Sequence, residues 1–139
     1  MTQEHKDILL KDLCARLPYG VKVESVFINP DTKKHKLCGI EVFDATSLLM
    51  IRDGLGEFKP YLFPLSSMTE EQLYEITELF GGEIDFSRVC LIELSTLHRN
   101  KLSYLEIIAI IDWFLKNHFD IHELIPMGLA IDATNFNIY

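Results

Sequence analysis

The sequence predicts an α+β fold: an N-terminal helix, a small antiparallel β-meander, then two or three helices with one or two additional short strands. Three observations predict it: helical spacing of leucines near the N-terminus, strand-like runs between residues 21 and 51, and two helix-capping motifs in the second half. With 139 residues, 48% of them hydrophobic and 24% charged, the chain has the size and composition of a soluble globular domain. No Gly/Ser linker, low-complexity run or internal repeat divides it, so we expect residues 1–139 to form a single domain.

The first predicted element is a helix over residues 3–17. Its apolar side chains recur at helical spacing: Leu9, Leu10, Leu13 and Leu17. The same spacing predicts that Asp7, Lys11 and Asp12 face away from the core. Pro18 ends the helix.

Strand-like sequence follows, and the predicted strands cover residues 21–28, 38–42 and 48–51. Residues 29–31 (Asn-Pro-Asp) and 53–56 (Asp-Gly-Leu-Gly) are predicted turns, and residues 32–36 form a basic loop tip. Residues 57–67 carry two prolines, so we expect an apolar connector there rather than a helix or a central strand.

Helix signals dominate the second half. Capping boxes at residues 69–72 (Thr-Glu-Glu-Gln) and 103–106 (Ser-Tyr-Leu-Glu) predict helices that end near residues 80 and 117. Asp120 is predicted to cap a short third helix. Residues 84–97 fit either a buried strand, which we favour, or a helix, and residues 129–133 alternate as a short closing strand.

Charge and cysteine content indicate the compartment and the partners. The net charge of −8 falls entirely on residues 68–139, so nucleic acid and anionic membranes should repel the protein. The basic residues 33–36 could touch phosphate, but a charged loop tip on an acidic protein is more often simply solvated, which is the interpretation we favour. The first residues lack the basic start and apolar run expected of a secretory signal, no run of 18 apolar residues occurs, and the three cysteines form no Cys-x-x-Cys pair. We therefore expect reduced, mostly buried thiols in a cytoplasmic protein that binds neither membrane nor nucleic acid.

Motifs that carry chemistry are absent or incomplete, so we expect no catalytic, cofactor-binding or metal-binding residues. His118 and His122 have the spacing of two zinc ligands on one helix, but a helix end between them would separate them, and a cationic His118 at that end is the simpler account. The glycines at residues 54 and 56 lack the third glycine of a dinucleotide loop. Ser66 and Ser67 lie outside any Gly-x-Ser-x-Gly motif.

Three segments, at residues 9–23, 59–72 and 111–133, resemble a family of small uncharacterised proteins encoded by phages and prophages of gut Bacteroidetes. The resemblance implies an accessory protein of a mobile element that works inside a bacterial host. It brings no assigned activity, cofactor or catalytic residue.

The leading functional hypothesis is a non-enzymatic protein-interaction protein of phage or prophage origin. The alternative is a small-molecule-binding, counter-defence protein, and an enzyme without a recognisable motif comes third. Trp113, Tyr61 and Phe63 are the expected partner-binding residues. Trp113 falls on the polar arc of its predicted helix, so either a partner or the tail at residues 129–139 should cover it. The oligomeric state is left open.

Overall fold

The computed structural model describes residues 2–80 and 104–139 and confirms the α+β class. Its elements, in chain order, are α1 (Gln3–Arg16), the 3-10 turn η1 (Leu17–Tyr19), β1 (Lys22–Ile28), β2 (His35–Val42), α2 (Ala45–Arg52), β3 (Gly56–Leu62), the 3-10 turn η2 (Leu65–Ser67), α3 (Glu70–Phe80), α5 (Tyr104–Lys116) and β4 (Ile131–Asp132). The predicted N-terminal, 70–80 and 104–117 helices are thereby confirmed, as is the short closing strand. The ambiguous segment at residues 84–97 and the predicted cap at Ser103 lie outside the described residues.

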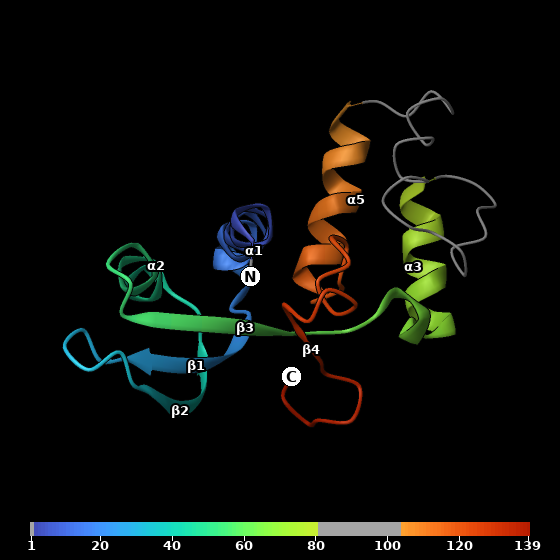
Figure 1. The fold of residues 1–139 in the computed structure, drawn as a ribbon. Coiled ribbons are helices and arrows are strands. Elements are labelled where there is room, and N and C mark those ends of the chain that lie inside the picture. Colours follow the sequence, from blue (N-terminus) through green and yellow to red (C-terminus); the bar gives the residue numbers. More distant parts are fainter. Residues whose placement is uncertain (1, 81–103) are drawn as a thin grey trace.

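The strands form one mixed sheet in the order β2-β1-β3-β4. β1 pairs antiparallel with both β2 and β3, whereas β4 pairs parallel with the last two residues of β3. Figure 1 shows α1 and α2 on one side of β3, with β1 and β2 on the other. One hydrogen-bonding edge of β3 is therefore paired with β1. The other edge faces the helices up to Tyr61, where β4 pairs with it.

Strand β3 corrects the expectation that residues 57–67 contain no central strand. Ile28 N–H donates to the Leu55 carbonyl across the β1–β3 ladder. Hydrogen-bonded pairs alternate with non-bonded pairs in an antiparallel ladder, so Pro60, opposite Val23, occupies a non-bonded position. The missing N–H of Pro60 thus removes no bond to β1. A proline is tolerated inside this strand because of its register.

Helix α2 corrects a second expectation, a strand over residues 48–51. Asp44 accepts a hydrogen bond from Ser47 N–H (3.0 Å), and the Ser47 hydroxyl accepts one from Asp44 N–H (3.3 Å). This reciprocal pair is a capping box, which satisfies two N–H groups at the start of the helix. A short apolar run does not distinguish strand from helix, and here the cap decides it.

The buried side chains form two clusters. One gathers around the facing sides of α3 and α5, which lie side by side in Figure 1: Ile76, Ile110, Phe114, Leu115, Phe119 and Ile121. The other joins α1 and the sheet to the segment before β4: Leu13, Val21, Val23, Phe43, Phe58, Leu62, Leu124, Leu129 and Ala130. None of the described helices has the length and apolarity needed to cross a membrane.

Helix α5 ends in a Schellman motif. His118 N–H donates to the Leu115 carbonyl and Phe119 N–H to the Phe114 carbonyl, with His118 in the left-handed conformation (φ 62°). The rings of Phe114 and Phe119 meet edge to face, which supplies the apolar contact typical of this motif. The predicted helix end near residue 117 is confirmed.

The short third helix predicted to start at Asp120 is wrong. Residues 121–130 form successive turns, with Glu123 at φ 57° and Gly128 at φ 73°. A left-handed Glu123 interrupts any helix at that position. Asp120 still binds the N–H groups that follow it, but it organises a turn instead of a helix.

Two expectations about surface and core also need correction. Asp12 is fully buried instead of facing solvent. Cys14 and Cys38 are exposed free thiols, because Cys14 lies on an outward face of α1 and Cys38 on the edge strand β2. Cys90 lies outside the described residues.

The predicted capping box at the start of α3 is confirmed, and its contribution to stability can be tested. Gln72 N–H donates to Thr69 Oγ1 (3.2 Å), and Thr69 N–H donates to Gln72 Oε1 (2.9 Å). We expect Thr69→Ala to lower the free energy of unfolding by about 1 kcal/mol in denaturant melts, because one helix N–H loses its acceptor. The control is Thr46→Ala, since Thr46 is an exposed threonine in the first turn of α2. Equal losses of unfolding free energy in Thr69→Ala and Thr46→Ala would contradict the assignment of Thr69 as the helix cap.

Candidate functional site

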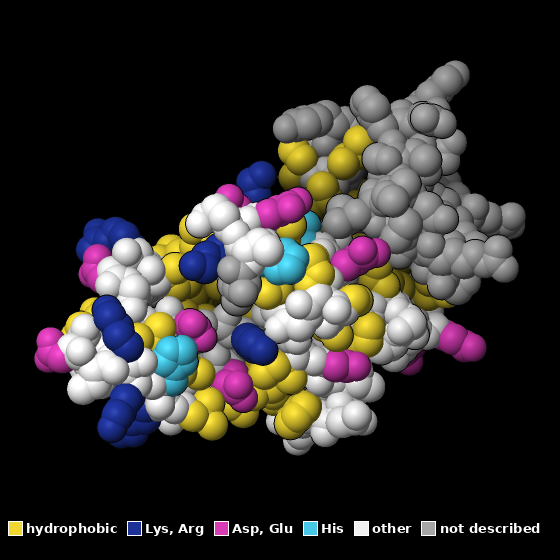
Figure 2. All heavy atoms as spheres, viewed as in Figure 1, with side chains coloured by type: hydrophobic (Ala, Val, Ile, Leu, Met, Phe, Trp, Pro, Cys, Tyr) yellow, Lys and Arg dark blue, Asp and Glu magenta, His cyan; other side chains and the backbone are white. Residues whose placement is uncertain are grey.

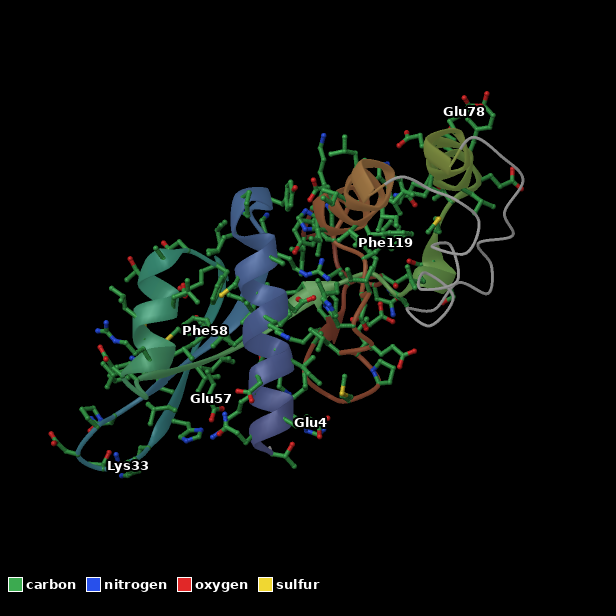
Figure 3. All side chains as sticks on the ribbon, turned by 90° about the horizontal axis from the view of Figure 1, so that it is seen from above. Glu4, Lys33, Glu57, Phe58, Glu78 and Phe119 are labelled. Carbon is green, nitrogen blue, oxygen red and sulfur yellow. The ribbon has the colours of Figure 1, made fainter. Side chains whose placement is uncertain are left out.

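A pocket of about 390 Å³ lies between α1, the end of α2 with the loop after it, and strands β1 and β3. Seven hydrophobic side chains line it: Leu9, Leu10, Leu13, Val26, Ile28, Ile51 and Phe58. Small-molecule sites have volumes of roughly 300–1,000 Å³ and mostly apolar walls, so the pocket falls within that class. In Figure 3, Phe58 lies between α1 and α2, and Glu57 lies at the same end of α1 as Glu4.

Polar groups of both charges lie around the apolar lining: Gln3, Lys6, Asp7, Glu24, Glu57 and Lys59. Gln3 donates to the Asp7 carboxylate at 2.8 Å. Among the described residues, Lys6 and Lys59 form no ion pair, so both ammonium groups are available to a ligand. Figure 2 shows the same intermixing of cationic, anionic and hydrophobic side chains on the face it presents.

Backbone groups of β3 also line the pocket. Ile28 and Leu55 form a hydrogen-bonded pair, and bonded pairs alternate with non-bonded pairs along the β1–β3 ladder. Val26–Glu57 and Glu24–Lys59 are therefore also hydrogen-bonded pairs. Gly56 and Phe58 occupy the positions between, so their N–H and C=O groups point away from β1. Gly56 has no side chain, which means that its backbone atoms themselves form the wall.

A buried ion pair holds the other half of α1. Asp12 and Arg16, one helical turn apart and both 0% exposed, form a two-point contact: Nε to Oδ2 at 2.7 Å and Nη2 to Oδ1 at 2.9 Å. Nη2 also donates to the Phe119 carbonyl at 2.6 Å. The pair therefore ties α1 to the chain just after α5.

His122 completes this polar cluster. Its Nδ1 lies 2.7 Å from Asp12 Oδ1, and because a carboxylate only accepts, Nδ1 carries the hydrogen. Burial by itself would raise the pKa of Asp12, but hydrogen bonds from His122 and Arg16 lower it below its ordinary value. The imidazole is 33% exposed. An Asp–His pair of this kind orients a general base in many enzymes, but it needs a nucleophile or a substrate at the free nitrogen.

Among the described residues, the only hydrogen bond of His122 is to Asp12. Asp12, Arg16 and His122 form a clamp between α1 and the C-terminal segment, because Asp12 contacts His122 and Arg16 contacts the Phe119 carbonyl. In the described part of the chain, no group of three or more His, Cys, Asp or Glu side chains has the arrangement of a metal site.

His118 is neutral instead of cationic. Burial, together with the charges of Arg16 and Lys22, lowers the pKa of His118 from 6.5 to about 4. Its ring stacks on Tyr139 with 3.8 Å between ring centroids. The Tyr139 hydroxyl in turn accepts from Lys22 N–H and donates to the Tyr61 carbonyl, and burial raises the pKa of Tyr139 to about 12.

The lowered pKa of His118 predicts a pH dependence of stability. The unfolded chain takes up a proton near pH 6.5 and the folded chain only near pH 4, so unfolding binds a proton between these values. The contribution of His118 is thus complete above pH 6.5 and is lost as the pH falls towards 4. We expect His118→Asn, which suits the left-handed backbone, to flatten the fall in unfolding free energy between pH 6.5 and 4. An unchanged slope in urea melts across that range would contradict the buried neutral imidazole.

The three expected partner-binding residues do not form one exposed surface. Tyr61 is 4% exposed and its ring meets Phe136 edge to face, while Phe63 packs between Phe119 and Tyr139. Trp113 is half-buried, stacks on Phe119 with 5.8 Å between ring centroids, and donates from Nε1 to Glu75. The cover of Trp113 among the described residues therefore comes from α3 and Phe119 instead of the tail.

The tail at residues 134–139 lies elsewhere. Its Phe136 and Tyr139 pack on Tyr61 and Phe63, and Lys22 donates from Nζ to the Ile138 carbonyl at 2.6 Å. The tail thus covers the end of β3 where β4 begins.

Sequence reasoning missed both the pocket and the clamp. The Asp12–Arg16 spacing of four residues was a visible signal for an ion pair on one helix face, but nothing local indicates its burial. The pocket walls come from α1, β1, β3 and the end of α2 with the loop after it, which only the fold brings together. Compared with protein-family models, with curated proteins and with solved structures, the chain matches none.

Proposed function

We propose that this protein is a non-catalytic binding protein whose pocket between α1 and strands β1 and β3 takes an amphipathic ligand. The observation that carries the proposal is the pocket itself, about 390 Å³ with seven hydrophobic side chains around its interior. An apolar body would fill this interior, and a polar end would meet the charged groups around it.

The charged groups limit the ligand further. Lys6 and Lys59 can pair with an anionic group, and Glu24 and Glu57 can pair with a cationic one. A ligand with both a positive and a negative group, or with neutral hydrogen-bond donors and acceptors, would pair with more of these side chains than a singly charged amphiphile would.

The protein-interaction role and the phage or prophage origin expected from the sequence remain proposals. The absence of a recognised catalytic motif and the acidic second half support the first, and the resemblance of residues 9–23, 59–72 and 111–133 supports the second. An intracellular location in the host is proposed on the same grounds.

The test uses an amphipathic naphthalene sulfonate dye and two variants. Leu10→Trp introduces a bulky ring at the pocket lining, whereas Leu49→Trp changes an exposed leucine of α2 that does not line the pocket. We expect saturable dye binding by the wild type and by Leu49→Trp, and at least a tenfold weaker affinity in Leu10→Trp. Equal dye binding by both variants, or no saturable binding by the wild type, would overturn the proposal.

A further inference from the structure

We propose that the occupant of the pocket is an extended segment of a partner protein, which adds to the open edge of β3 as a further strand. This inference rests on the proposed function and names the class of its ligand. Three features of β3 support strand addition: unpaired backbone groups, an edge that already pairs with β4, and the alternation of side chains beside this edge.

The unpaired backbone groups belong to Gly56 and Phe58. Both residues are buried, and their N–H and C=O groups point away from β1, towards the edge of β3 where none of the described strands pairs with them. A buried backbone group without a partner is unfavourable by an amount comparable to a lost hydrogen bond. A ligand that supplies a donor and an acceptor at each of these two residues therefore gains binding free energy that an apolar molecule does not.

The same edge already pairs with a strand farther along. β4 joins β3 at Tyr61 and Leu62, and Ala133 N–H donates to the Leu62 carbonyl at 2.8 Å. The free stretch runs from Gly56 to Pro60, roughly 13 Å at the rise of a β-strand. An added segment would extend the sheet beside this stretch, in line with β4. Strand addition of this kind is an established mode of peptide recognition.

The register fixes how long the paired part must be. In an antiparallel pair, residues two apart point their backbone groups to the same neighbour and each exchanges both bonds with the residue opposite, so one partner residue serves Gly56 and the residue two positions along serves Phe58. A core of three residues is therefore sufficient. The side chains of this three-residue core would alternate between the two faces of the sheet. In the pocket they would meet apolar lining residues that include Leu13, Ile51 and Val26.

The charges around the pocket suit the residues that flank this core. Lys6 and Lys59 would attract a carboxylate, and Glu24 and Glu57 an ammonium or guanidinium group. The partner segment is therefore three apolar residues between residues of opposite charge. A peptide satisfies the mixed lining and the open backbone edge at once, whereas a simple amphiphile leaves the backbone groups of Gly56 and Phe58 unpaired.

The experiment uses capped pentapeptides with Val, Leu or Phe at the three central positions and Lys and Glu at the ends, in both orders. Each is titrated into the full chain, and the best binder is then remade with N-methyl groups on the amides of residues 2 and 4, or on that of residue 3 alone. Alternate amides face opposite edges of a strand. We expect one methylated peptide to bind at least tenfold more weakly and the other to stay within threefold of the parent. Equal affinities, or equal losses, would overturn strand addition.

A second readout locates the pairing. We expect the bound peptide to slow amide hydrogen exchange at Gly56 and Phe58 at least tenfold, and the naphthalene sulfonate dye to leave these two rates unchanged. Saturable dye binding that Leu10→Trp abolishes, with no peptide bound, would leave the proposed function standing and refute the strand addition. Failure of both dye and peptides to bind would refute both.

Discussion

Asp12→Asn should lower the free energy of unfolding by about 3–5 kcal/mol, which is the range found when one member of a buried ion pair is removed. The substitution nearly preserves shape but leaves the guanidinium of Arg16, which is 0% exposed, without a counter-charge. It also weakens the contact with His122, so the C-terminal segment loses part of its attachment to α1. Chemical denaturation at neutral pH measures the loss.

The double variant Asp12→Leu/Arg16→Met separates an unpaired charge from lost packing. Replacing both members by apolar side chains of similar size leaves no buried charge, so the double variant should be more stable than Asp12→Asn alone. The exposed pair Arg52–Asp53, 2.9 Å apart, is the matched control, and Asp53→Asn should leave the melting curve unchanged. A double variant less stable than Asp12→Asn would show that the ion pair stabilises the fold by more than charge neutralisation.

The ion pair also shows where sequence reasoning stops. Leucine spacing predicted α1 correctly, because packing of an apolar face is a local pattern. The same helical spacing predicted that Asp12 faces solvent, because charged residues are assigned to the outward face of a helix. The long-range partners of the ion pair are the Phe119 carbonyl, which accepts from Arg16, and the His122 imidazole, which contacts Asp12; both lie more than 100 residues away in sequence. Long-range partners of this kind leave no trace in periodicity.

The sheet shows a similar limit. Alternation predicted β1 and most of β2, but the prolines misled the assignment of β3, because whether a proline breaks a ladder depends on register. Register is a property of two strands together, and Pro60 alone does not reveal it. The pocket and the open edge of β3 follow from the same register, so neither could be derived from single segments of the sequence.

Helix ends were easier to predict. The box at Thr69 and Gln72 and the end of α5 near Asn117 rest on side-chain and backbone bonds between residues at most five apart. At Asp120 the local signal was right in kind, since its carboxylate does accept the N–H groups that follow. The predicted helix does not form, because the N–H groups that Asp120 accepts belong to Leu124 and Ile125. These residues lie four and five positions after Asp120, and the bonds close a turn.

Asp120→Ala is expected to lower the free energy of unfolding by about 2–4 kcal/mol. Asp120 is 6% exposed, and its carboxylate accepts from Leu124 N–H at 2.8 Å and from Ile125 N–H at 2.9 Å. Each N–H left unpaired in a buried site is unfavourable by about 1–3 kcal/mol. Burial raises the pKa of Asp120 despite these two bonds, so the ionised carboxylate already carries a desolvation penalty that offsets part of the loss.

The consequence of Asp120→Ala should be concentrated in residues 121–130. Leu124 and Leu129 are buried in the cluster that joins α1 to the sheet, and the Asp120 turn places them there. Asp120→Asn keeps one acceptor oxygen and should fall between wild type and alanine. Asp132, exposed and bonded to Thr134, is the control, because solvent replaces the bonds that Asp132→Ala removes. Hydrogen exchange that accelerates at Leu124 and Ile125 in Asp120→Ala, and stays unchanged in Asp132→Ala, would confirm that this carboxylate holds the segment; equal losses of stability in the two variants would refute it.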